Sequence, residues 1–183
     1  MITLITDRQI CKTSLVTKIE ELMSKNRIDQ VILREKDLEE KELFYLYLEL
    51  KKLIENSPIN LIVNASLSFA KKYRLNQIHL SQENIQKISS VEAVKNISFG
   101  VSVHSKEEIE FALKFKPDYL LISPIFKTDC KKGKRPLGIR LLKEYQDIIN
   151  VPLIALGGIN DENIFQLEQL NITNIAMRSN LLT

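Results

Sequence analysis

Several residue types are scarce or missing in this chain of 183 residues, and each absence narrows the choice of protein class. It has no tryptophan, two cysteines, five glycines and five prolines. Cys11 and Cys130 stand far apart and form no metal-binding spacing, and so little glycine and proline argues against long disordered segments. No apolar run approaches the roughly 18 residues that span a membrane. With no N-terminal signal pattern, we expect a reduced cytoplasmic protein without a membrane partner.

An excess of either charge is also lacking. The 26 basic and 23 acidic residues leave a net charge of only +3, and no basic run is interleaved with aromatic residues. These features argue against a nucleic-acid partner. The length predicts a single domain over residues 1–183, and 44% hydrophobic residues are enough for a substantial core.

Short apolar runs alternate with helical patterns along the whole chain, about 20 residues apart. Strands are expected at 2–7, 30–33, 60–63, 77–80, 97–101, 119–122, 152–156 and 174–177. Helices are expected at 13–23, 39–56, 66–73, 85–88, 105–115, 139–149 and 161–170, the last capped by Asp161. Eight buried strands joined by helices predict a parallel α/β fold, a (β/α)8 TIM barrel, with an open flavodoxin-like sheet as the alternative.

This barrel would be short, because the chain ends soon after the eighth strand and leaves the eighth helix largely missing. Leu181 and Leu182 are expected to be too few to cover the apolar flank of the first and last strands. We therefore expect a partner subunit, as in a homo-oligomer, or the first helix to cover it.

Polar residues gather where the predicted strands end, and in a barrel all these ends face one mouth, where active sites lie. In chain order they are Asp7, Arg34, Lys36, Asn64, Ser81, Gln82, Ser102, His104, Thr128, Lys131, Gly157, Gly158, Arg178 and Ser179. The glycines after the seventh strand and the Arg-Ser pair after the eighth match the common phosphate site of such barrels. The sequence therefore predicts a small-molecule phosphate ligand at this mouth.

Motifs over nearly the whole chain resemble the family of thiamine phosphate synthase and its TenI-type paralogue, a thiazole tautomerase. They are Leu4-Ile-Thr-Asp7, Leu33-Arg-Glu-Lys-Asp37, Val63-Asn64, Ile78-His-Leu80, Gln82-Glu83, Gly100-Val-Ser-Val-His104, Asp118-Tyr119, Pro124-Ile-Phe-Lys-Thr128, Ala155-Leu-Gly-Gly-Ile159 and Ile175-Ala-Met177 with Ser179. The resemblance implies a barrel that binds a thiazole phosphate. In the synthase a pyrimidine diphosphate also binds and joins the thiazole nitrogen as pyrophosphate leaves.

The resemblance also implies a role for each matching residue. Arg34 and Lys36 would bind the pyrophosphate and pyrimidine, Asn64 and Lys131 the pyrophosphate, and Ser102 the pyrimidine. The thiazole phosphate would be held by Thr128, Gly157, Gly158 and Ser179.

The chain departs from the synthase pattern at its metal ligands. Two aspartates that hold magnesium there are replaced by Ala65 and Asn84, and only Glu83 remains nearby. We therefore expect no metal ligands in the protein, and Mg²⁺ only if synthase activity is retained. The loop around Cys130 looks like the TenI-type paralogue, but Pro124 stands where that branch carries its histidine.

A tautomerase needs a group that titrates near neutrality, and the chain has two histidines. His104 is the better candidate, with Lys131 as a second catalytic candidate, because His79 lies inside a predicted strand. The main hypothesis is a TenI-type barrel that binds thiazole phosphate, either as a binding protein alone or as a thiazole tautomerase. The alternatives are a thiamine-phosphate synthase with an altered metal site and a non-catalytic regulatory barrel.

Overall fold

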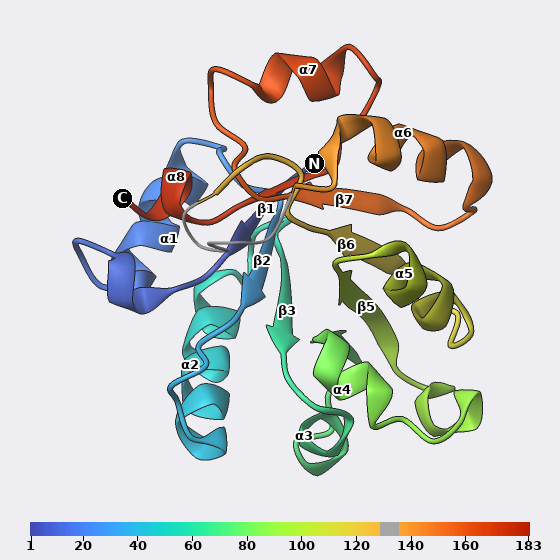
Figure 1. The fold of residues 1–183 in the computed structure, drawn as a ribbon. Coiled ribbons are helices and arrows are strands. Elements are labelled where there is room, and N and C mark those ends of the chain that lie inside the picture. Colours follow the sequence, from blue (N-terminus) through green and yellow to red (C-terminus); the bar gives the residue numbers. More distant parts are fainter. Residues whose placement is uncertain (129–135) are drawn as a thin grey trace.

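In the computed structural model, which describes residues 1–128 and 136–183, eight parallel strands close into a barrel (Figure 1). Closure is made by β1 pairing with β8, where Ile2 lies opposite Ile175 and Leu4 opposite Met177. The predicted TIM barrel is thus confirmed and the open sheet is excluded. The strands are β1 (Ile2–Ile5), β2 (Gln30–Leu33), β3 (Asn60–Asn64), β4 (Gln77–Leu80), β5 (Ser98–Val103), β6 (Tyr119–Ile122), β7 (Leu153–Leu156) and β8 (Ile175–Met177).

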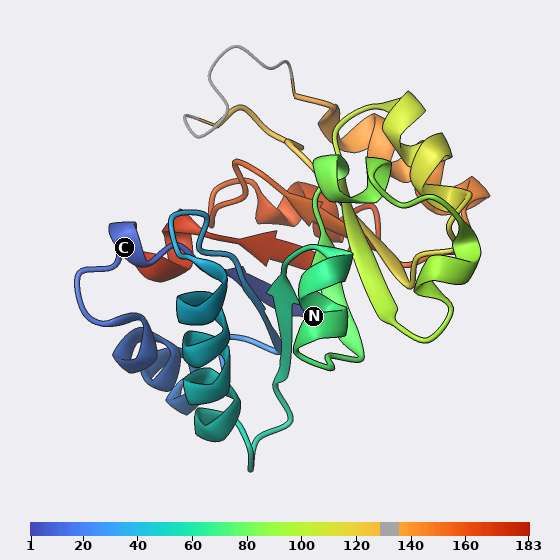
Figure 2. The same cartoon turned by 90° about the horizontal axis from the view of Figure 1, so that it is seen from below.

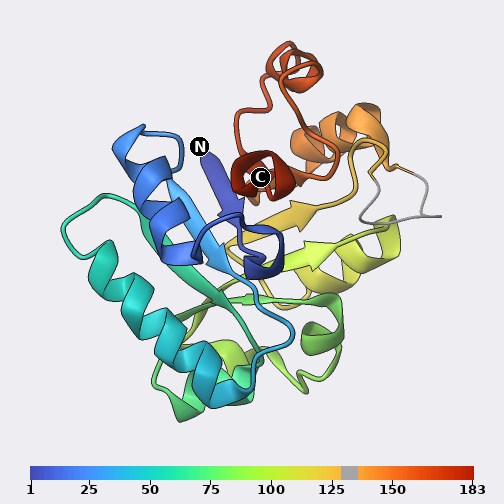
Figure 3. The same cartoon turned by 90° about the vertical axis from the view of Figure 1, so that its left-hand side faces the viewer.

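Helices surround the strands on the outside, as the views from below and from the side also show (Figures 2 and 3). The α-helices are α1 (Leu15–Ser24), α2 (Glu40–Leu53), α3 (Leu67–Lys72), α4 (Gln82–Gln86), α5 (Lys106–Leu113), α6 (Gly138–Ile148), α7 (Ile164–Glu168) and α8 (Ser179–Leu182), and the 3-10 helices are η1 (Arg8–Ile10) and η2 (Val91–Val94). The weak pattern after the fourth strand becomes a helix of five residues, and the eighth helix has only four.

The strands bury both faces, as the continuous apolar runs predict. One hydrophobic cluster fills the barrel interior, formed by Ile5, Ile32, Ile62, Tyr119, Leu121, Ile154 and Ala176. A larger cluster lies between the strands and the helices and includes Leu4, Val31 and Leu120, all fully buried. Toward the amino-terminal ends the interior is polar, where the Gln30 amide donates to the Thr3 hydroxyl over 3.3 Å. Because side chains alternate between the two faces of a strand, every second residue of each strand points into the barrel interior or its mouth.

Serine side chains cap the amino-terminal ends of several helices. The oxygens of Ser14, Ser66, Ser81 and Ser105 each accept a hydrogen bond from a backbone N–H in the first turn. The expected cap at Asp161 is wrong, because α7 begins at Ile164, three residues later. The Asn160 carboxamide oxygen instead accepts the N–H groups of Glu162 and Asn163 and holds a turn there.

The short carboxyl end covers more apolar surface than we expected. Leu181 and Leu182 are buried, and the outward side chains Leu4, Ile175 and Met177 are buried as well, all within a single chain. Of the two expected covers, a partner subunit or the first helix, the subunit is not needed, because the flank is buried within one chain and its hydrophobic cluster includes Leu15 and Ile19 of α1. A homo-oligomer stays a prediction, but an uncovered apolar flank no longer supports it.

Candidate active site at the carboxyl-terminal mouth

A cavity of about 500 Å³ opens where the strands end, and most of the predicted site residues line it. These are Arg34, Lys36, Asn64, Ser102, His104, Thr128, Gly157, Gly158 and Ser179. Their strands are far apart in the chain, so closure of the barrel is what brings them together. Lys131 and Cys130 lie outside the residues that the structure describes.

Other residues line the cavity that the sequence did not single out as site residues, or ranked low. His79 projects from β4, Lys127 and Ser123 follow β6, and Asn160 and Asn180 follow the last two strands. Lys127 lies next to Thr128, so position in the loop could have indicated it. His79 could have been found from strand alternation, because it stands two residues before Ser81 on the same face.

The cavity is basic. Its lining among the described residues includes Arg34, Lys36, Lys127 and Arg178 and has no carboxylate. Burial lowers the pKa of the Arg34 guanidinium, and the positive charge of Arg178 lowers it further, but an arginine stays charged at neutral pH. Low dielectric surroundings strengthen the attraction of such groups for an anion. This arrangement suits a phosphorylated ligand.

An ion pair places Arg178 at this mouth. Its Nη1 lies 3.2 Å from Oδ2 of Asp7, which follows β1, and both side chains are about three-quarters shielded from solvent, with 25% and 21% exposed. The carboxylate joins the ends of β1 and β8, the two strands that close the barrel. Asp7 therefore orients the guanidinium and also reduces the positive potential around it.

The two glycines after β7 are required by close packing and by their backbone conformation. Gly157 has φ +104° and Gly158 has φ +69°. A Cβ on Gly158 would lie 2.4 Å from the Lys127 carbonyl oxygen, and one on Gly157 would lie 2.8 Å from Cα of Pro124. The loop after β6 thus rests directly on this turn. The turn lines the same cavity as Lys36, so it lies where the phosphate-site prediction needs it.

His104 is held by the start of the loop after β6. Its Nδ1 donates to the Ser123 carbonyl oxygen over 2.8 Å and lies 3.2 Å from the Ser123 hydroxyl. Its backbone N–H donates to the Glu108 carboxylate over 2.7 Å. These contacts fix the imidazole in the wall of the cavity, within reach of a bound ligand.

The residues at the expected magnesium position do not fit a magnesium ion. Ala65 has no donor atom, and the Asn84 backbone caps α4 through the Ser81 hydroxyl. Glu83, the carboxylate next to Asn84 in the sequence, is 77% exposed and pairs with Lys87 at 2.6 Å, which lowers its pKa. Magnesium prefers carboxylate oxygens, and the described part of the chain brings none into this cavity. Glu83 therefore does not replace the missing ligands.

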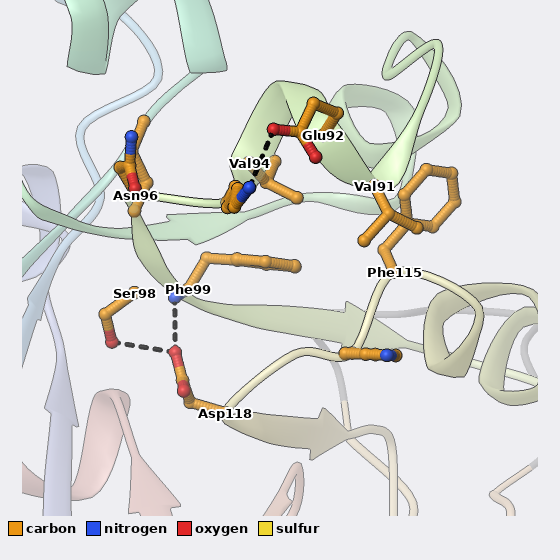
Figure 4. A pocket seen from close by; sticks show the side chains of 11 residues that line it. Val91, Glu92, Val94, Asn96, Ser98, Phe99, Phe115 and Asp118 are labelled. Atoms are coloured by element: carbon orange, nitrogen blue, oxygen red, sulfur yellow. Dashed lines mark hydrogen bonds and ion pairs between the residues drawn. The ribbon is translucent and has the colours of Figure 1, made fainter.

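A second hollow lies at the opposite end of the barrel, near the starts of β5 and β6 (Figure 4). There the Asp118 carboxylate accepts hydrogen bonds from the Ser98 hydroxyl and the Phe99 backbone N–H, both at 2.7 Å. Asp118 thus links the starts of the two strands. The apolar side chains Val91 and Phe115 border the hollow, and the Asp118 carboxylate within it is engaged in holding the fold.

The fold and this mouth define a class: closed parallel α/β barrels with a basic, polar cavity at the carboxyl ends of the strands. A family model described as thiamine monophosphate synthase matches residues 2–181. The thiamine-phosphate synthase of Clostridium tetani is 32% identical over 184 residues, covering 98% of this chain and 86% of that protein. That of Clostridium acetobutylicum is 29% identical over 181 residues, with 98% and 86% covered.

Among solved structures, thiamine phosphate pyrophosphorylase from Pyrococcus furiosus superposes with a TM-score of 0.79 and 25% identity, covering 97% of this chain and 85% of that one. The chain belongs to the thiamine monophosphate synthase family, so its place in thiamine biosynthesis is confirmed. No helix in the described ranges has the length and apolarity to cross a membrane.

Proposed function

We propose that the protein is a thiamine-phosphate synthase, which joins a hydroxymethylpyrimidine diphosphate to a thiazole phosphate. The observation that carries the proposal is the match over nearly the whole chain to proteins named as this synthase. The basic cavity, whose described lining contains no carboxylate, supports it, because both proposed substrates are anions. The tautomerase hypothesis gives way, since these relatives are named as synthases.

The reaction exchanges one bond for another. The bond between the pyrimidine methylene carbon and the diphosphate oxygen breaks, and its electron pair leaves with pyrophosphate. The thiazole nitrogen lone pair then forms the new bond to that carbon. The protein must stabilise the departing anion, which is the work we assign to Arg34 and Lys36. Thr128, the Gly157–Gly158 turn and Ser179, which line the same cavity, would hold the thiazole phosphate.

The histidines add little support for proton transfer as the main task. Burial lowers the pKa of His79 to about 3, so this imidazole does not titrate near neutrality. Pro124 offers no acid or base. His104 remains the candidate for a proton step in a tautomerase, and bond exchange in the synthase requires none at this residue.

The test supplies both proposed substrates to the purified chain, at magnesium concentrations from zero to a millimolar excess. We expect thiamine phosphate and pyrophosphate in equal amounts, and Arg34→Gln should lower the rate by at least tenfold. Arg27→Gln is the matched control, because Arg27 is exposed and precedes β2, whereas Arg34 follows it. Ligand binding without turnover at any magnesium concentration would refute the synthase and favour a regulatory barrel.

A further inference from the structure

Three polar side chains form a chain of hydrogen bonds across the barrel interior. The Tyr119 hydroxyl on β6 lies 2.9 Å from Nδ1 of His79 on β4, and Nε2 of the same imidazole lies 2.8 Å from Oγ of Ser102 on β5. Tyr119 and His79 are buried, whereas Ser102 is partly exposed and lines the cavity. These hydrogen bonds therefore connect the buried interior of the barrel to the cavity.

The direction of these hydrogen bonds follows from Tyr119. Within the described part of the chain its hydroxyl has a single partner, Nδ1 of His79. If Nδ1 carried the proton and donated to the tyrosine, the buried tyrosine proton would have no acceptor, which is costly. Tyr119 therefore donates to Nδ1.

A neutral imidazole has one protonated nitrogen, so donation from Tyr119 to Nδ1 places the proton on Nε2. Complete burial and the charge of Arg34 keep the pKa of His79 near 3, and the ring is neutral at physiological pH. Nε2 then donates to Oγ of Ser102. The serine oxygen acts as acceptor in that bond, and among the described residues its hydroxyl proton has no acceptor, so a ligand lone pair would satisfy it.

Strand β5 makes room for this arrangement. A Cβ on Gly100 would lie 2.0 Å from Cζ of Tyr119, far inside van der Waals contact. Gly100 and Ser102 are two residues apart on one face of β5, so the tyrosine ring occupies the space over the glycine while its hydroxyl reaches His79. The position of the Tyr119 hydroxyl, the first donor of the three, thus depends on the lack of a side chain at Gly100.

We propose that Tyr119 and His79 are positioning residues that present the Ser102 hydroxyl to the cavity as a hydrogen-bond donor. The ligand group that it meets is then a lone pair, and a ligand with an N–H at this point is disfavoured. Assignment of that lone pair to a ring nitrogen of the pyrimidine rests on the proposed function. The donor and acceptor roles of Tyr119, His79 and Ser102 do not depend on the proposed function.

The first experiment reads the tautomer directly. Long-range ¹H–¹⁵N spectra of the full chain distinguish protonated from unprotonated imidazole nitrogens, and His104→Gln assigns the signals because the chain has two histidines. We expect His79 to carry its proton on Nε2 and to show no titration between pH 8 and pH 5. Protonation on Nδ1, or a cationic ring in this range, would overturn the proposal.

The second experiment reads specificity. The pyrimidine diphosphate is compared with an analogue in which a ring nitrogen is replaced by C–H, with each ring nitrogen replaced in turn. Wild type should disfavour one analogue by roughly five- to tenfold in kcat/KM, and Ser102→Ala and His79→Leu should lose this preference. His79→Gln should retain most of it, because its amide can accept from Tyr119 and donate to Ser102.

These outcomes separate the two proposals. A wild-type chain that makes no thiamine phosphate refutes the proposed function, and the tautomer spectrum still decides the polarity. If Ser102→Ala keeps the full preference while remaining active, or if wild type shows none, the donor role is refuted although the synthase stands. Near-ultraviolet circular dichroism of each variant checks that its fold is intact.

Discussion

The ion pair between Asp7 and Arg178 allows a prediction in which two substitutions at one contact have opposite effects. Arg178→Gln should weaken the binding of inorganic pyrophosphate, since it removes one of the cations that line the cavity. Asp7→Asn should strengthen it, because the carboxylate 3.2 Å from Arg178 reduces the positive potential there. Asp7→Asn nearly preserves the shape of the side chain, so its effect is mainly electrostatic.

The magnitudes follow from the environment of the pair. A charge-assisted hydrogen bond contributes about 1.5–3 kcal/mol, and one-quarter exposure of Arg178 places it near the lower end. We therefore expect roughly tenfold weaker binding for Arg178→Gln. A partly exposed ion pair is worth at most about 1 kcal/mol, so Asp7→Asn should tighten binding by about two- to fivefold. Both effects should shrink as salt is raised.

Isothermal titration calorimetry with pyrophosphate in EDTA measures these affinities without any metal. The double variant shows whether the two residues act through each other, since Asp7→Asn should gain little once Arg178 is gone. Arg27→Gln, at the opposite end of β2, serves as the charge control. Unchanged affinity for Arg178→Gln, or weaker binding by a well-folded Asp7→Asn, would refute the assignment of Arg178 to the anion site.

Three further predictions concern metal, acid and packing. The wild-type chain should bind little Mn²⁺, as measured by electron paramagnetic resonance, and form thiamine phosphate slowly at sub-millimolar magnesium. The double variant Ala65→Asp with Asn84→Asp should raise both the metal affinity and the rate. Tight metal binding by wild type would contradict this prediction. The pKa of His79 is lowered from 6.5 to about 3, so its contribution to stability is full above pH 6.5 and declines as the pH falls toward 3. Urea unfolding should lose about 2 kcal/mol from this group between pH 7 and pH 5, a loss absent in His79→Gln and retained in His104→Gln. Gly100→Ala should lower the midpoint of thermal unfolding by about 4–12 °C, because the new methyl group overlaps a buried ring; a shift below 2 °C would show that the strand moves aside at little cost.

Local patterns carried much of the fold. Continuous apolar runs predicted the strands to within a few residues, because strands covered on both faces need apolar side chains throughout. Serine caps such as Ser105 follow from the same local chemistry. The cap at Asp161 failed because Asn160, one residue earlier, competes for the same N–H groups. The prediction of an exposed flank beside Leu181 was wrong, because the number of apolar residues does not tell how deeply each one is buried.

The sequence was enough to predict the order of elements, the barrel, and the gathering of polar residues such as Arg34, Ser102 and Gly157 at one mouth. These features depend on periodicity and on the rule that parallel strand ends meet. The tertiary structure alone decided the contacts between strands distant in the chain. It joined Asp7 to Arg178, and it placed Tyr119 against His79, where a hydroxyl that must be satisfied sets the proton on an imidazole. Such partners cannot be read along the chain, because they follow from the register and closure of the sheet.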